Sequence, residues 1–299
     1  MSLQALIKLL TILGLIGIML SIGFKVRIGD ILTSARKPRQ LIMSLVANYV
    51  LVPAVTWGLL YLIHADPMVA VGFLLLAICP GAPVGPPFVA IAKGDVPFAI
   101  GQMVILSCLC IVVSPALLPP LLDLLHIDGE LRISPLAIGN TLLVVQLLPL
   151  CAGLLMRHWL PELTGRIARV VELLASTILL AAIILILFRE QQSLAGIRLR
   201  GWGTMFVLLF SSLGIGWVCG GPDRKTRKAL ALTTSARNIA VALVIVSTNL
   251  AGTPAVTAVV AYGLISILGT FVGACGLALF PESSGSPIPQ APSECCTNG

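Results

Sequence analysis

The sequence predicts an all-α polytopic membrane protein with about nine transmembrane helices. Of its 299 residues, 58% are hydrophobic and only 10% are charged, whereas a soluble domain carries roughly 25% charged residues. Apolar runs of about 20 residues, the length that crosses a bilayer as a helix, recur along the whole chain. Two of these runs are interrupted by residues that break a helix or are costly in lipid.

The apolar runs define the expected spans in chain order. They cover residues 3–24, 41–63, 67–92, 96–122, 134–156, 168–188, 202–220, 228–249 and 255–280. The first run lacks a basic start and a clear cleavage site, so we interpret it as a span and not as a signal peptide. Residues 281–299 are rich in Pro, Ser and Gly, which predicts a disordered cytoplasmic tail after a transmembrane domain over 1–280.

The loops between the spans differ in charge. Lys and Arg gather after the first, third, fifth and seventh spans, and the loop from Arg189 to Arg200 is the one mildly basic exception among the others. Basic loops stay in the cytoplasm. We therefore expect a multi-pass protein of the cell (inner or plasma) membrane with its N-terminus outside and its C-terminus cytoplasmic. The net charge of +7 reflects this orientation, and no nucleic-acid partner is expected.

The third span contains a dense break. Four prolines and two glycines fall between Pro80 and Pro87, and each proline lacks the N–H that a continuing helix needs. The flanks are too apolar for a surface loop, and broken helices persist in a membrane only where protein or a water-filled cavity covers them. The alternative is a proline-kinked structural helix.

The eighth span contains a polar break. Thr233, Thr234 and Ser235 precede Ala236, and Arg237 and Asn238 follow it. An arginine at a helix centre costs about 2.5–3.5 kcal/mol on insertion scales, so an intramembrane charge favours a functional site. The alternative is that Arg237 satisfies broken-backbone carbonyls or a buried partner.

The two breaks occupy corresponding places. One lies in the second span of the trio 41–122 and the other in the second span of the trio 202–280. These trios enter the membrane with opposite sense, which predicts an inverted-repeat core with two broken crossing helices. Paired interrupted spans point to the binding site of a secondary transporter.

Short motifs in the expected order resemble the bile acid:sodium symporter family over about residues 10–280. They are Met19–Lys25, Asn48-Tyr49, Pro53-Ala54, Pro80-Gly81, Ala92–Asp95 and Ala236-Arg237-Asn238 followed by Ala240 and Ala242. The resemblance implies a core domain over about 41–122 and 202–280, and a panel domain over about 3–24 and 134–188. It also implies coupled uptake of organic anions with sodium.

The chain departs from that family at the places that bind sodium. Thr233 stands where coupled members have a glutamate that serves both sodium sites, and Arg237 replaces the adjacent glutamine. Gly85-Pro86 replaces a Ser-Asn pair, while Asn48 matches a further amide ligand. A cation beside a fixed guanidinium is repelled by several kcal/mol even at an effective dielectric constant near 20.

The sequence therefore predicts sodium-independent transport of a small organic anion, with Arg237 in place of the coupling cation. The candidate substrate-binding residues are Arg237, Asn238, Thr233, Thr234, Ser235, Asn48, Pro80, Gly81 and Gly85. No metal site and no cofactor are expected, the lipid bilayer is the other partner, and a homodimer is left open. Alternatives are a sodium- or proton-coupled symporter of the same family, or an arsenite-efflux-like permease that uses Cys79.

Other polar residues have structural interpretations. The sequence has no His-rich cluster, G-x-S-x-G motif or acidic pair at metal spacing, so we expect no enzyme. Asp95 is expected to cap the fourth span, and Glu172 to pair with Arg169. Interhelical hydrogen bonds are expected of Gln102, Ser107, Asn140 and Gln146.

Overall fold

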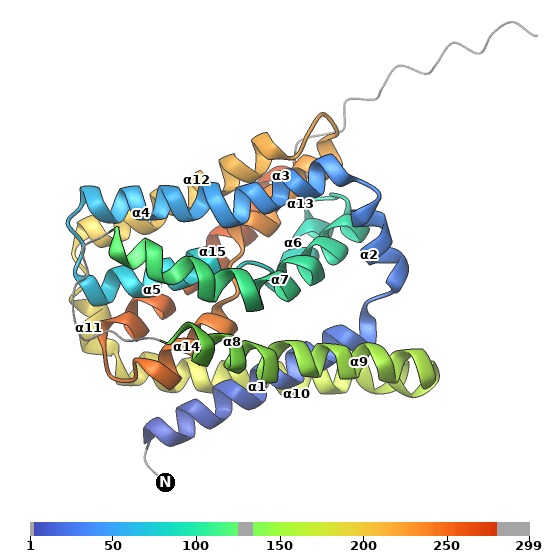
Figure 1. Cartoon of the computed structure of the whole chain (residues 1–299), viewed down its shortest axis with the longest axis horizontal. Coiled ribbons are helices and arrows are strands. Elements are labelled where there is room, and N and C mark those ends of the chain that lie inside the picture. The colour runs from blue at the N-terminus through green and yellow to red at the C-terminus, as the bar shows by residue number, and fades with distance from the viewer. Residues whose placement is uncertain (1–2, 125–133, 280–299) are drawn as a thin grey trace, which may run out of the picture.

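A computed structural model of the protein describes residues 3–124 and 134–279. This part of the chain is almost entirely helical and contains no strand (Figure 1). Eight of its helical stretches are long and apolar enough to cross a membrane. They are α1 (Leu3–Lys25), α3–η1–α4 (Pro38–Leu62), α7 (Val96–Asp123), α8–η2–α9 (Pro135–Trp159), α10 (Pro161–Arg189), α12 (Leu199–Cys219), α13–α14 (Arg224–Asn249) and α15 (Pro254–Ala278). The predicted all-α polytopic class is confirmed.

Both predicted breaks are present. The third expected span consists of two short helices, α5 (Pro67–Ile78) and α6 (Gly85–Ile91). The eighth consists of α13 (Arg224–Ser235) and α14 (Ile239–Asn249), and Asn238 caps α14 by accepting from the Val241 backbone N–H. At the first break, Gly81 has φ 82°, a conformation that glycine adopts at little cost.

The boundaries differ in a few places from those that hydropathy predicts. Helix α10 begins at Pro161, well before the expected residue 168, and α13 begins at Arg224. Two short helices that hydropathy does not indicate connect longer ones: α2 (Ile28–Ala35) and α11 (Gln191–Ala195). Apolar runs mark only the part of a helix that lies in the hydrocarbon region. Hydropathy therefore does not predict polar helix ends or interfacial helices.

The helices form layers (Figure 1). Helices α1, α9 and α10 lie along one side, α3, α4 and α12 lie along the other, and the broken helices lie between them with α7 and α15. Helix α1 packs against α9 and α10, α5 packs against α15, and α12 packs against α13. The most apolar part of α13–α14 is wholly buried, so protein covers the second break as a broken membrane helix requires.

Two of the long stretches contain a π-helical turn. These turns are η1 (Ala47–Leu51), between α3 (Pro38–Val46) and α4 (Val52–Leu62), and η2 (Leu143–Leu147), between α8 (Pro135–Leu142) and α9 (Leu148–Trp159). Each is followed at once by a proline, Pro53 or Pro149, whose missing N–H removes one bond of the helical ladder. The division into a core and a panel stays a prediction, and the expected tail 281–299 lies outside the described residues.

Candidate functional site at the helix crossing

The two breaks are joined by backbone and amide contacts. The Asn238 backbone N–H donates to the Cys79 carbonyl at 3.0 Å, and the Asn238 side-chain amide Nδ2 donates to the Gly81 carbonyl at 3.4 Å. These bonds link residues about 160 positions apart along the chain. The predicted crossing of the two broken helices is therefore present.

Side chains of α7 supply donors for the first break. Ser107 Oγ donates to the Gly81 carbonyl at 3.1 Å, and Ser114 Oγ donates to the Ile78 carbonyl. Gln146, in η2, donates through Nε2 to the Ser107 carbonyl at 2.6 Å. Ser107 and Gln146 are thus interhelical hydrogen-bond groups, as expected. The break leaves carbonyls that the helix cannot satisfy, and α7 satisfies two of them.

Helix α15 supports the second break in the same way. Ser266 Oγ donates to the Ser235 carbonyl at 2.7 Å and accepts from the Arg237 backbone N–H at 3.4 Å. Thr270 Oγ1 donates to Ser235 Oγ at 3.0 Å. Sequence reasoning missed these two residues. Their signal is a polar stripe, because Tyr262, Ser266 and Thr270 recur every four residues on one face of an apolar helix.

Arg237 is the largest of the fully buried side chains and is only 1% exposed. Its Nη1 donates to the Ala77 carbonyl at 3.1 Å, while Nε and Nη2 have no hydrogen-bond partner among the described residues. Arg237 belongs to none of the ion pairs among the described residues. Its titratable neighbours are Tyr262, Cys79 and Tyr49. The site therefore holds a buried cation that no described acidic side chain balances.

Helix geometry gives this cation a partial counter-charge. Ala77 belongs to the last turn of α5, and Arg237 follows the last residue of α13 by two positions. The carboxyl ends of helices carry partial negative charge, and cations are stabilised there by about 0.3–2 kcal/mol. Such stabilisation offsets only part of the cost of burying an arginine. The nitrogens Nε and Nη2 of Arg237 therefore remain available to bind a ligand.

A neutral polar cluster adjoins the crossing. Thr233 Oγ1 donates to Gln102 Oε1 at 3.1 Å, and Gln102 Nε2 donates to Ser44 Oγ. Asn48 Nδ2 donates to Thr234 Oγ1 at 3.3 Å, while Asn48 Oδ1 has no partner. The cluster is buried and contains oxygens and amides without a formal charge.

The candidate residues from the sequence converge on this region. Arg237, Asn238, Gly81 and Asn48 lie at the contacts given above, and Pro80 lies between two carbonyls that Asn238 contacts. Gly85 lies beside Thr233: a Cβ atom on Gly85 would be 3.2 Å from Thr233 Cγ2. Ser235 forms the end of α13 that α15 supports. Gln102, expected as an interhelical group, connects two helices of this cluster.

Two further expectations concern charged residues near the predicted cytoplasmic side. Asp95 accepts from the Phe98 backbone N–H at 3.1 Å, so it caps α7 as expected, and it also pairs with Lys37 Nζ at 2.6 Å. The expected pairing of Glu172 with Arg169 is wrong, because Glu172 pairs with Lys25 of α1. A lysine on a packed neighbouring helix is closer to Glu172 than the arginine one turn before it.

The site is a buried cluster of neutral polar groups beside one fixed positive charge. Among residues 3–124 and 134–279, no group of three or more His, Cys, Asp or Glu side chains is placed to hold a metal ion. Two broken helices that cross inside a helical membrane protein form the arrangement that secondary transporters use. The fold and the crossing thus define a membrane transporter.

Comparison with known proteins gives the family. The family model described as the sodium bile acid symporter family matches residues 12–197. Because the match covers more than half of the chain, the protein belongs to the sodium bile acid symporter family. This agrees with the resemblance in the sequence motifs.

Individual relatives are distant. The uncharacterized sodium-dependent transporter YocS of Bacillus subtilis (strain 168) is 25% identical over 228 residues, which is 74% of this chain and 68% of that protein. Sodium/bile acid cotransporter 5 of Rattus norvegicus is 26% identical over 163 residues, 54% of this chain and 37% of that protein. The probable sodium/metabolite cotransporter BASS1, chloroplastic, of Arabidopsis thaliana is 25% identical over 165 residues, 55% and 40% respectively. The match thus spans less than half the length of the rat and plant proteins.

Proposed function

We propose that the protein is a secondary transporter that moves a small organic anion without sodium, and that Arg237 takes the place of the coupling cation. The observation that carries the proposal is the buried guanidinium, 1% exposed, with two unpartnered nitrogens and no described acidic partner. The names of the relatives include transporters of bile acids and metabolites. The chemical class of substrate is therefore a small organic anion.

The electrostatics of the crossing disfavour a sodium ion. Two unit charges about 4 Å apart repel by about 4 kcal/mol at an effective dielectric constant of 20. The cluster around Thr233, Gln102 and Asn48 offers neutral oxygens but no carboxylate to offset that repulsion. The fixed charge of Arg237 supports a site that needs no mobile cation to attract an anion.

The free nitrogens of Arg237 suit a carboxylate or sulfonate. Nε and Nη2 are the two unpartnered nitrogens, and they form one edge of the planar guanidinium. Two parallel N–H donors on one edge bind two oxygens of an anion in a bidentate pair. Since the side chain is covered here, the proposal requires that core and panel separate during transport to admit the anion.

Uptake into proteoliposomes tests the proposal. We expect the initial rate for a panel of radiolabelled carboxylates and sulfonates to stay unchanged when choline replaces sodium. Arg237→Gln is expected to lower the rate at least tenfold, while Arg39→Gln, at an exposed position of the predicted cytoplasmic loop, leaves it unchanged. A sodium requirement, or full transport by Arg237→Ala, would refute the proposal.

A charge exchange at two positions gives a sharper test. The double variant Thr233→Glu/Arg237→Gln restores the carboxylate and the amide that the family resemblance implies at these places. We expect it to transport only when sodium is present, with a rate that rises with sodium concentration. The single variant Arg237→Gln is the matched control, and its rate should not respond to sodium.

The second candidate function is sodium-coupled symport. It is favoured by the sodium dependence stated in the name of the Bacillus subtilis relative and by the unpartnered, buried oxygen Asn48 Oδ1, which is a suitable ligand atom for a hard cation. Under this alternative, choline replacement abolishes uptake by the unmodified protein. The choline experiment therefore decides between the two.

A further inference from the structure

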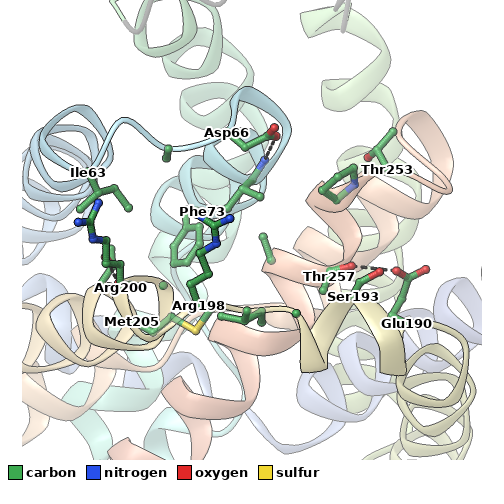
Figure 2. A pocket seen from close by; sticks show the side chains of 18 of the residues that line it. Ile63, Asp66, Phe73, Glu190, Ser193, Arg198, Arg200, Met205, Thr253 and Thr257 are labelled. Carbon is green, nitrogen blue, oxygen red and sulfur yellow. Dashed lines mark hydrogen bonds between the residues drawn. The ribbon is translucent and has the colours of Figure 1, made fainter.

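A cavity lies away from the crossing, where the ends of several helices meet (Figure 2). Its volume is about 750 Å³. Its walls come from the turn between α4 and α5, from α11, and from the first residues of α12 and α15. These segments include the basic loop 189–200 that the charge pattern of the sequence leaves unexplained. By the predicted orientation, the cavity opens on the outer face.

Two arginines on the walls of this cavity have side chains without a hydrogen-bond or ion-pair partner among the described residues. Figure 2 shows Arg198, just before α12, extending towards Phe73, and Arg200, in the first turn of α12, extending towards Ile63. Neither guanidinium makes a hydrogen bond or ion pair within the described part of the chain. Two unpaired guanidinium groups on the walls of one cavity form a site to which an anion is attracted.

The acidic side chains of the cavity already have partners. Asp66 caps α5 by accepting from the backbone N–H groups of Met68 and Val69. Glu190 accepts from Thr257 Oγ1 at 2.8 Å and lies 3.7 Å from Arg189. His64, the remaining titratable group on the walls, adds no negative charge. Because Glu190 is balanced by Arg189, the two arginines outweigh the single negative charge of Asp66, and the walls carry a net positive charge.

Helix ends add to this potential. Helices α5, α12 and α15 all begin at the cavity, at Pro67, Leu199 and Pro254. The first turns of α12 and α15 have no side-chain cap, so no acidic side chain offsets the partial positive charge of these two helix ends. Two uncapped helix ends and two arginines thus border one space.

We infer that this cavity is an outer binding site for a small organic anion with an apolar body, separate from the crossing. Its volume falls in the range of about 300–1,000 Å³ that small-molecule sites occupy. Phe73, Ile197 and Met205 supply an apolar wall, and the arginines bind the carboxylate or sulfonate. The inference rests on the geometry of this cavity and does not require the proposed transport function.

Binding to the full chain in nanodiscs of zwitterionic lipid tests the site. The probe is naphthalene-2-sulfonate, and naphthalene-2-sulfonamide is its neutral counterpart, both measured by titration calorimetry. We expect Arg198→Gln/Arg200→Gln to weaken sulfonate binding at least tenfold and to leave sulfonamide binding unchanged. Arg198→Lys/Arg200→Lys, which keeps the charge, should retain most of the affinity.

Two further variants separate this site from other causes. Arg36→Gln/Arg39→Gln removes the same charge from exposed positions of the predicted cytoplasmic side and should bind the sulfonate as the unmodified protein does. Arg237→Gln should also keep the binding, even where transport is lost. Wild-type affinity in Arg198→Gln/Arg200→Gln, or equal weakening by Arg36→Gln/Arg39→Gln, would overturn the inference. Loss of binding in Arg237→Gln alone would show that the probe binds at the crossing and not in this cavity, which would support the proposed function instead.

Discussion

At the scale of single residues, the site combines one charge with many backbone carbonyls. Ser107, Ser114 and Ser266 donate hydroxyl hydrogens to carbonyls that the two breaks expose. Arg237 and Asn238 donate to carbonyls of the other broken helix. The arginine therefore satisfies a broken-backbone carbonyl, which was the structural alternative for it, and still has two donors left. The structural interpretation of Arg237 is thus confirmed, and its role in binding an anion stays a prediction.

Gly81 offers a prediction at this scale. Its φ of 82° is strained for any residue with a side chain, and a Cβ there would lie 2.5 Å from Ser107 Oγ. We expect Gly81→Ala to lower the free energy of unfolding by about 1–3 kcal/mol, seen as a lower thermal midpoint in detergent. Gly58→Ala, in the middle of α4 with no atom within 4 Å of the added Cβ, should be neutral or slightly stabilising. Equal midpoints for the two variants would contradict the strain at Gly81.

The sequence predicted Arg237 and the glycines of the first break as site residues, because a charge or a helix-breaking residue is costly within an apolar helix. It did not identify the partners Ser266 and Thr270, because a hydroxyl in a membrane helix is cheap and common. Nor did it find the ion pair of Lys25 with Glu172. Partners on different helices depend on packing, and spacing along one helix does not reveal them.

At the scale of helices, α13 depends on its cap. Asp223 accepts from the backbone N–H and the hydroxyl of Thr226, at 2.9 and 2.6 Å. Burial alone would raise the pKa of Asp223, but these hydrogen bonds and the nearby Lys37 lower it overall. A lowered pKa in the folded state means that the stabilisation is complete above the ordinary aspartate pKa and is lost as the pH falls through the folded value.

Asp223→Ala is accordingly expected to reduce the free energy of unfolding by about 1 kcal/mol at neutral pH. Its stability deficit relative to the unmodified protein should shrink as the pH falls below the ordinary aspartate range. Asp223→Asn keeps a cap but not the charge, so at pH 7 it should be less stable than the unmodified protein and more stable than Asp223→Ala. Thermal unfolding in detergent at several pH values measures both. A deficit in Asp223→Ala that does not change with pH would argue against the ionised cap.

Close packing of α1 against α9 is a further feature of the helices. A Cβ on Gly153 would lie 2.5 Å from the Leu20 carbonyl and 2.9 Å from the Gly23 Cα, so only glycine fits at this contact. We expect Gly153→Val to separate the two helices and to lower the thermal midpoint by several degrees. Gly165→Val, in α10, where an added Cβ meets no atom within 4 Å, is the control. A midpoint that is unchanged in Gly153→Val would contradict tight contact.

At the scale of the whole molecule, we infer from loop charges that the N-terminus is outside and the C-terminus is cytoplasmic. Reporter fusions in bacterial cells test this orientation. Alkaline phosphatase joined after Gly252 should be active, whereas phosphatase joined after Gly221 should be inactive. Green fluorescent protein at the same two positions should give the opposite pattern. Activity of phosphatase after Gly221 would reverse the assigned orientation.

Much of the fold follows from the sequence because hydrocarbon imposes a simple rule. A span needs about 20 apolar residues, and both departures from that rule, at 80–87 and 233–238, proved to be breaks in helices. What hydropathy could not provide is the relative placement of the helices. The cavity in Figure 2 is an example, since its residues come from three separate segments of the chain and include loops without a shared motif.

The joining of the two breaks also has a consequence for biogenesis. Arg237 and its acceptor Ala77 are 160 positions apart, so at a synthesis rate of about 5–20 residues per second the acceptor waits about 8–32 s for its donor. Ser107 and Ser114 are made much earlier and can cover the Gly81 and Ile78 carbonyls soon after insertion. The carbonyls of Ala77 and Cys79 have no such early partner among these contacts. The carbonyls of Ala77 and Cys79 therefore enter the membrane before their donors are translated, and the end of α5 completes its hydrogen bonds only when the second half of the protein is inserted.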